Sequence, residues 1–157
     1  TANGVDFNRM IMLSAVLTRR ARVGLGNQDI MVNVPGGMKM NEPAGDLGIA
    51  LSLASSHLDL PLNSDTVFLG EIGLNGEIRR VPQVERRLWE AVRHGFHTAI
   101  VPRSSVDRIS IPPSMKIIGV DNLRAAMTES GLIRKGSGQE SDSPTVGAES
   151  AKKKEIR

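Results

Sequence analysis

The stretch NEPAGDLGIALSLASS, residues 41–56, is the first part of this sequence that could carry chemistry, because a Pro-led turn of small residues leads into an apolar helix. Some enzymes present a nucleophile in such a turn. That role needs a Ser, Thr or Cys beside a base, and PAGDLG offers only Asp46, whose carboxylate is a weak nucleophile. Glu42 and Asp46 also have a simpler explanation, since negative charge is favourable near the first turn of a helix. The turn by itself does not predict an active site.

Three serines and one lysine are the other reactive groups near this turn. Ser52, Ser55 and Ser56 are interpreted as small packing residues or as donors to helix carbonyls. Lys39 is a candidate base for one of them, although its spacing does not favour that role. The sequence has no Cys, and its three His lack metal-ligand spacing, so neither a thiolate nucleophile nor a metal site is predicted.

A second candidate is the segment from Arg79 to Arg108, in which every basic residue is an arginine, opposed by Glu85, Glu90 and Asp107. Guanidinium groups bind phosphates bidentately and keep their charge, so these side chains can follow a sugar-phosphate backbone without reading its sequence. The alternative is a solvated helix face with local pairs such as Arg86 with Glu90. Trp89 and Phe96 are the only aromatic residues of the segment, which does not indicate stacking on single-stranded bases.

Length and composition limit the classes of protein to which this chain can belong. A chain of 157 residues with 39% hydrophobic and 24% charged residues is typical of one soluble globular domain. No apolar run reaches the roughly 18–20 residues that span a bilayer. A net charge of +3 is too small to indicate a nucleic-acid-binding protein without the clustering described above. The first residues, TANGVDFNRM, do not resemble a signal peptide, and the missing initial Met suggests a fragment or a processed form.

Hydrophobic patterning predicts an α+β fold. Helices are expected over residues 5–21, 41–58, 82–94 and 121–130, with Asn41 and Asp121 as N-caps and Gly95 ending the third. Strands are expected over residues 27–35, 97–102 and 115–120, and Asn75-Gly76 predicts a hairpin between apolar runs at 67–69 and 78–81. Residues 1–130 then form one domain. Residues 131–157 contain almost nothing apolar and are predicted to be a disordered tail.

Several long motifs carry a resemblance to a known family. The segments MKMNEPAGDLGIALSLASS (38–56) and VFLGEIGLNGEIRRVPQVERRLWEAVRHGFHTAIVP (67–102) resemble the C-terminal Lon-protease-like domain of the bacterial and plant-organellar DNA repair protein RadA, also called Sms. GVDFNRMIMLSAVL (4–17) and NQDIMVNVPGG (27–37) are similar to the helix and strand that precede them in the family. The resemblance covers about residues 3–130. It implies a Lon proteolytic-domain-like fold, a mixed sheet with packed helices, and the sequence is expected to lack the N-terminal strand that the family usually has.

The same resemblance locates the positions of the peptidase dyad. Active Lon peptidases carry Ser in a DGPSAGIA-type turn and Lys in the helix after a GEI motif, and these positions correspond here to Asp46 and Glu85. Neither dyad residue is present, so no catalytic residue is assigned. Two carboxylates facing one cleft can still act as an acid/base pair or hold a cation, which is kept as an alternative. The RadA-like domains are expected to use the fold without peptidase chemistry.

The resemblance further implies a non-catalytic domain that supports ring assembly and sequence-independent DNA binding, for ATP-dependent branch migration by the full-length protein in DNA repair and recombination. The DNA-binding candidates are Arg79, Arg80, Arg86, Arg87, Arg93 and Lys39. The implied partners are single-stranded or branched DNA, a homo-hexamer of the protein and a recombinase, without a membrane. The implied location is the bacterial cytoplasm, or a chloroplast or mitochondrion in a plant.

No cofactor is expected in this chain, because it has neither a Walker A pattern nor zinc-finger cysteines. ATP, Mg and Zn are expected only in the N-terminal domains of the full-length family protein. Two other functions remain open at this point: a Lon-type ATP-dependent serine peptidase domain, and a pure oligomerisation scaffold.

Overall fold

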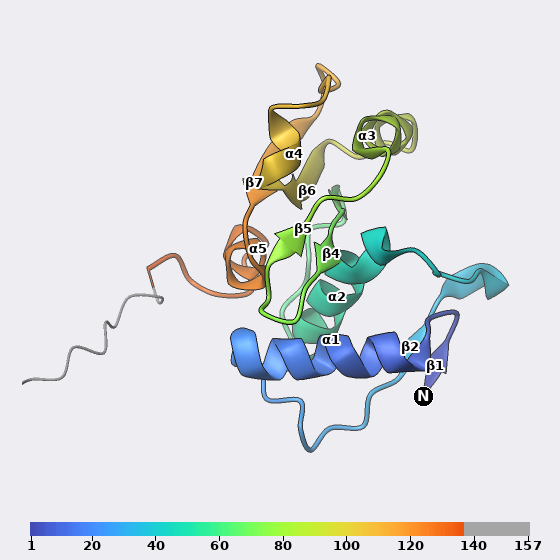
Figure 1. The fold of residues 1–157 in the computed structure, drawn as a ribbon, viewed down its shortest axis with the longest axis vertical. Helices are drawn as coiled ribbons and strands as arrows, with labels where there is room; N and C mark the ends of the chain where they lie inside the picture. Colours follow the sequence, from blue (N-terminus) through green and yellow to red (C-terminus); the bar gives the residue numbers. More distant parts are fainter. Residues whose placement is uncertain (137–157) are drawn as a thin grey trace, which may run out of the picture.

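Helices α1 (Phe7–Arg20) and α2 (Asp46–Leu58) cross each other in one half of the molecule (Figure 1). The computed structural model describes residues 1–136. Helix α1 buries Met10, Leu13 and Leu17 at the spacing of an amphipathic helix, and Asp6 caps it by accepting a hydrogen bond from the backbone N of Arg9 at 2.8 Å. The helix predicted over residues 5–21 is thereby confirmed, and the helix predicted over 41–58 forms from Asp46 onward.

The other half is built on a parallel sheet of order β3 (Thr66–Phe68), β6 (Thr98–Pro102) and β7 (Lys116–Val120). Strand β6 is buried on both faces. Ala99 and Val101 face the apolar cluster that includes α3 (Val84–Arg93), whereas Ile100 belongs to the cluster of α1 and α2. Because successive side chains of a strand point to opposite faces of the sheet, β6 contributes side chains to both apolar clusters. The strands predicted over 97–102 and 115–120 are confirmed.

A hairpin of β4 (Glu71–Ile72) and β5 (Ile78–Arg79) follows β3. Its turn contains the predicted Asn75-Gly76 pair, with Gly76 at a φ of 80°. The apolar run at 67–69 was expected to pair in this hairpin, but it forms β3 of the parallel sheet instead. The chain changes direction at Gly70, where an added Cβ would lie 2.6 Å from Cγ2 of Ile78, so close packing there depends on glycine.

The N-terminal residues form a two-stranded parallel sheet, β1 (Ala2–Asn3) with β2 (Val32–Asn33). No strand is predicted at residues 2–3 from the sequence, because two residues are too short for a periodic pattern. Of the strand predicted over 27–35, only β2 is formed, and the 3-10 turn η1 (Pro35–Gly37) comes after it. The strands therefore lie in three small sheets rather than in one mixed sheet.

Both predicted N-caps were wrong. Asn41 precedes a 3-10 turn, η2 (Pro43–Gly45), and α2 begins only at Asp46. The cap of α5 (Leu123–Glu129) is Asn122, whose Oδ1 accepts a hydrogen bond from the backbone N of Ala125 at 2.8 Å. Asp121 instead pairs with Arg103 at the start of the short helix α4 (Arg103–Val106), with 3.0 Å between the charged atoms. Gly95 does end α3, at a φ of 87°.

Ordered structure continues past residue 130. Leu132 is 3% exposed and packs in the cluster of α1, α2 and α5, and its backbone N donates to the carbonyl of Met127 at 2.9 Å. The first residues of the predicted disordered tail are therefore part of the packed structure. Residues 137–157 lie outside the described part of the chain. Within the described part, no helix is long and apolar enough to cross a membrane.

Candidate functional site

Asp46, which the sequence resemblance aligns with the peptidase nucleophile, is buried, with 1% of its surface exposed. It is the first residue of α2, where the N-terminal end of the helix favours a negative charge. Its Oδ2 accepts a hydrogen bond from the backbone N of Ile72 at 3.1 Å. Its two oxygens also accept a bidentate pair of hydrogen bonds from Arg9, of which the Nε to Oδ1 contact is 2.5 Å.

Arg9 reaches Asp46 from α1, and its side chain remains 29% exposed. The hydrogen bonds and charge of Asp46 raise the pKa of Arg9, against the opposing effect of burial. Glu71 adds a second carboxylate at 3.9 Å from the guanidinium. The Asp46 carboxylate is therefore held in an ion pair with Arg9, and its contacts connect α1, α2 and the hairpin. Arg9 is not predicted from the sequence, since nothing near residue 9 in the chain indicates a partner at residue 46.

Glu85, which the sequence resemblance aligns with the dyad lysine, forms its hydrogen bond in another part of the molecule. It is exposed in the first turn of α3, and its Oε2 accepts a hydrogen bond from the backbone N of Ser110 at 3.0 Å, in the loop after α4. The partners of Asp46 lie instead in α1 and β4. The structure gives no support for an acid/base or cation-binding pair of these two carboxylates. Within residues 1–136, no three acidic or histidine side chains gather as metal ligands would.

The serines of α2 behave as expected for structural residues. Ser52 donates to the carbonyl of Gly48 at 2.8 Å, and Ser55 donates to the carbonyl of Leu60 at 2.5 Å. Ser56 is exposed, and so is Lys39, in the loop between η1 and η2.

The arginines predicted to contact DNA lie on β5, directly after it, and on α3. Three of them are ion-paired: Arg79 with Glu77 at 2.7 Å, Arg87 with Glu42, and Arg93 with Glu90 at 3.3 Å. Exposed pairs of this kind contribute only about 0–1 kcal/mol, so a phosphate can displace the carboxylate. Each pair nevertheless lowers the net positive charge that the segment presents to an anion.

Arg80 and Arg86 are exposed, and neither forms an ion pair with any residue of the described chain. Arg86 lies on the side of α3 opposite the buried Val84 and Leu88. The alternative pair of Arg86 with Glu90 is not formed, because Glu90 pairs with Arg93 and His94. Of the predicted arginines, these two are best placed to meet a phosphate.

Lys39 is connected to this segment through its loop. Glu42, three residues further on, pairs with Arg87, which also donates from Nε to the carbonyl of Pro82 at 3.1 Å. The loop that carries Lys39 therefore lies beside α3, although no contact places Lys39 itself on an arginine.

Residues 2–105 match the family model described as subunit ChlI of Mg-chelatase. The chain belongs to this family. The match ends within α4, so it includes the Asp46 site, the hairpin and the arginine segment, and excludes β7 and α5.

Curated relatives of this chain are DNA repair proteins named RadA. The chain is 43% identical to RadA of Streptococcus pneumoniae over 81% of its own length and 30% of the relative's. It is 44% identical to RadA of Bacillus subtilis, over 82% of the chain and 28% of the relative. For RadA of Halalkalibacterium halodurans the identity is 45%, over 80% of the chain and 28% of the relative. The RadA resemblance found in the motifs is confirmed, and the chain spans less than a third of these relatives.

Proposed function

We propose that this chain is a non-catalytic, Lon-like domain of a RadA-type DNA repair and recombination protein, in which it supports ring assembly and contacts the DNA backbone. The names of the relatives support the DNA repair assignment. The burial of Asp46 against Arg9 supports the absence of peptidase chemistry, because a carboxylate held by three hydrogen bonds replaces the hydroxyl nucleophile.

The rest of the proposed activity belongs to the full-length protein. ATP-dependent branch migration, with ATP, Mg and Zn bound by other domains, a homo-hexameric ring and a recombinase partner are proposed from the relationship to RadA. The bacterial relatives favour a bacterial cytoplasmic location over a plant organelle.

The chain is expected to cleave no protein substrate. The dyad positions hold two carboxylates whose hydrogen bonds go to different elements, so no hydroxyl is activated by a neighbouring base. Casein digestion and labelling with a fluorophosphonate serine probe check this. A triple variant with Ser52, Ser55 and Ser56 changed to Ala is the control for a contaminating protease. Cleavage that is blocked by the probe and lost in that variant would contradict the prediction.

The proposed DNA contact rests mainly on Arg80 and Arg86, which have no carboxylate partner in the described chain. Binding through phosphates is independent of sequence and falls with salt, since each neutralised phosphate contributes about −0.9 to the log-log slope on duplex DNA. The arginines with partners can contribute after exchanging a carboxylate for a phosphate.

The double variant Arg80→Ala, Arg86→Ala is expected to reduce the magnitude of the salt slope of DNA binding by about two, because two phosphate contacts are lost. The measurement is the DNA affinity of the full-length protein over a series of salt concentrations. Lys116→Ala is the matched control, since Lys116 is exposed on β7, outside the arginine segment. Equal slopes for the double variant and the unmodified protein would show that these arginines contact solvent and not DNA. That result would favour the scaffold function.

Assembly is supported by apolar side chains left in solvent. Phe7 and Ile11 are 55% and 49% exposed and stand one turn apart on α1, while Met31 and Met38 are 81% and 67% exposed. Exposed apolar groups of this size are typical of surfaces that associate. The mass of the protein in solution, measured by light scattering, tests whether a ring forms.

A further inference from the structure

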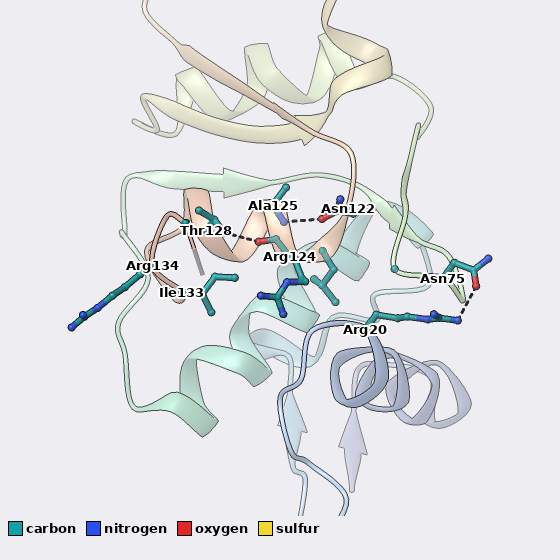
Figure 2. Close-up of a pocket in the computed structure, with 11 residues that line it drawn as sticks. Arg20, Asn75, Asn122, Arg124, Ala125, Thr128, Ile133 and Arg134 are labelled. Atoms are coloured by element: carbon teal, nitrogen blue, oxygen red, sulfur yellow. Dashed lines mark hydrogen bonds between the residues drawn. The ribbon is translucent and has the colours of Figure 1, made fainter. Parts of the chain in front are cut away.

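A groove with a volume of about 570 Å³ lies where α5 meets the end of α1 and the turn of the hairpin (Figure 2). Four parts of the chain line it: Arg20 from α1, Asn75 from the hairpin turn, Asn122 and Arg124 from the start of α5, and Ile133 and Arg134 after α5. The volume is within the range of about 300–1,000 Å³ that is usual for small-molecule sites.

The groove is positively charged. None of its lining residues is acidic, and neither Arg20 nor Arg124 forms an ion pair with any residue of the described chain. Arg20 donates a hydrogen bond from a terminal nitrogen to Oδ1 of Asn75 at 3.0 Å, which orients the guanidinium but leaves its charge uncompensated. Figure 2 shows Arg20 extended toward Asn75, and Arg124 projecting from α5. Two guanidinium groups without a carboxylate partner in one groove favour the binding of an anion.

The hairpin turn that forms one wall is attached firmly to α5. The backbone N of Leu123 donates to the carbonyl of Gly76 at 2.8 Å, and Ile78 donates to the carbonyl of Asp121 at 2.9 Å. At Gly76 an added Cβ would be 3.1 Å from Cβ of Arg20, so the absence of a side chain lets α1 approach the turn. The Asn-Gly pair therefore shapes the groove as well as the hairpin.

We propose that this groove binds the phosphate of a nucleotide unit, either as a free nucleotide or as part of a DNA strand. The guanidinium groups of Arg20 and Arg124 supply bidentate donors for the phosphate oxygens. The amides of Asn75 and Asn122 add hydrogen-bonding groups, and Leu123 and Ile133 add apolar surface for a sugar or base. The proposal does not depend on the DNA contacts assigned to Arg80 and Arg86, which lie on another part of the chain.

Isothermal titration of the 157-residue chain with inorganic pyrophosphate, with ADP and with a short DNA duplex tests the proposal. The double variant Arg20→Gln, Arg124→Gln is expected to bind at least ten times more weakly than the unmodified chain. Lys116→Gln is the matched control, because it removes one exposed positive charge on β7, at a residue that neither lines the groove nor belongs to the arginine segment, and it is expected to leave these affinities unchanged. Thermal melting of each variant shows that the fold is kept, and Arg124→Gln alone serves if the double variant does not fold.

The outcomes separate the two sources of phosphate. Binding of pyrophosphate or ADP that is lost in the double variant supports a free-nucleotide site. Binding of DNA alone, weakened tenfold in the double variant, supports a backbone phosphate in the groove. Binding of none of the three probes, or equal affinities for the double variant and the unmodified chain, would overturn the proposal. A loss of DNA binding in Arg80→Ala, Arg86→Ala with unchanged ADP binding would show that the two sites are independent.

Discussion

Replacing Arg9 with Met is expected to lower the free energy of unfolding by about 3–5 kcal/mol, because it leaves a buried carboxylate without its charged partner. Asp46 is 1% exposed and cannot turn toward water, since it is anchored at the first residue of α2. The hydrogen bond from Ile72 at 3.1 Å remains but does not neutralise the charge. Urea unfolding followed by circular dichroism measures the loss.

The opposite replacement, Asp46→Leu, is expected to cost less, about 1–3 kcal/mol. Arg9 is 29% exposed and can reach solvent when its partner is gone, which leaves mainly the unsatisfied backbone N of Ile72. The double variant is expected to cost less than the sum of the single ones, as is usual for a coupled pair. Arg19→Met, an exposed arginine of the same helix, is the control and is expected to stay within about 0.5 kcal/mol. If Arg9→Met and Asp46→Leu lowered the free energy of unfolding equally, and the double variant lowered it by their sum, the ion pair would not couple the three elements.

Ending the chain at Ser130 is expected to lower the thermal midpoint by roughly 10 °C, because it removes Leu132 from the apolar cluster. Leu132 is 3% exposed, and burial of a leucine side chain in a core contributes about 2–5 kcal/mol when measured by replacement with Ala. Ile133, packed against the same cluster, adds to the loss. Differential scanning calorimetry of the shortened chain measures the change, and Leu132→Ala in the full chain separates the side chain from the truncation.

A chain that ends at Gly136 is the matched control for this truncation. The sequence beyond it contains Val146 and Ile156 as its large aliphatic residues, so its composition predicts an unchanged midpoint. An unchanged midpoint for the chain that ends at Ser130 would contradict the role of Leu132 and restore a boundary at residue 130.

Local patterns in the sequence were sufficient to predict most of the elements. The apolar stripe of α3, with Val84, Leu88 and Ala91, matches the buried face in the structure. The β-branched runs at β6 and β7, and the Asn75-Gly76 turn, were also predicted. These signals succeed because helix periodicity, strand runs and turn residues act over a few neighbouring positions. The RadA motifs were equally readable, since they are long contiguous segments.

The tertiary structure alone decided which charges meet. Arg9 and Asp46 are 37 residues apart, and Arg87 and Glu42 are 45 apart, so no local pattern could pair them. The assignment of the 67–69 run to a parallel sheet likewise depends on β6, a partner about 30 residues away at Thr98–Pro102. The partner of a charge or a strand is set by where packing brings distant segments together, whereas sequence reports mainly on neighbours. For this reason Asp46 and the arginines were found as candidates from sequence, while their pairing, the separation of Glu85 and the Arg20–Arg124 groove came from the fold.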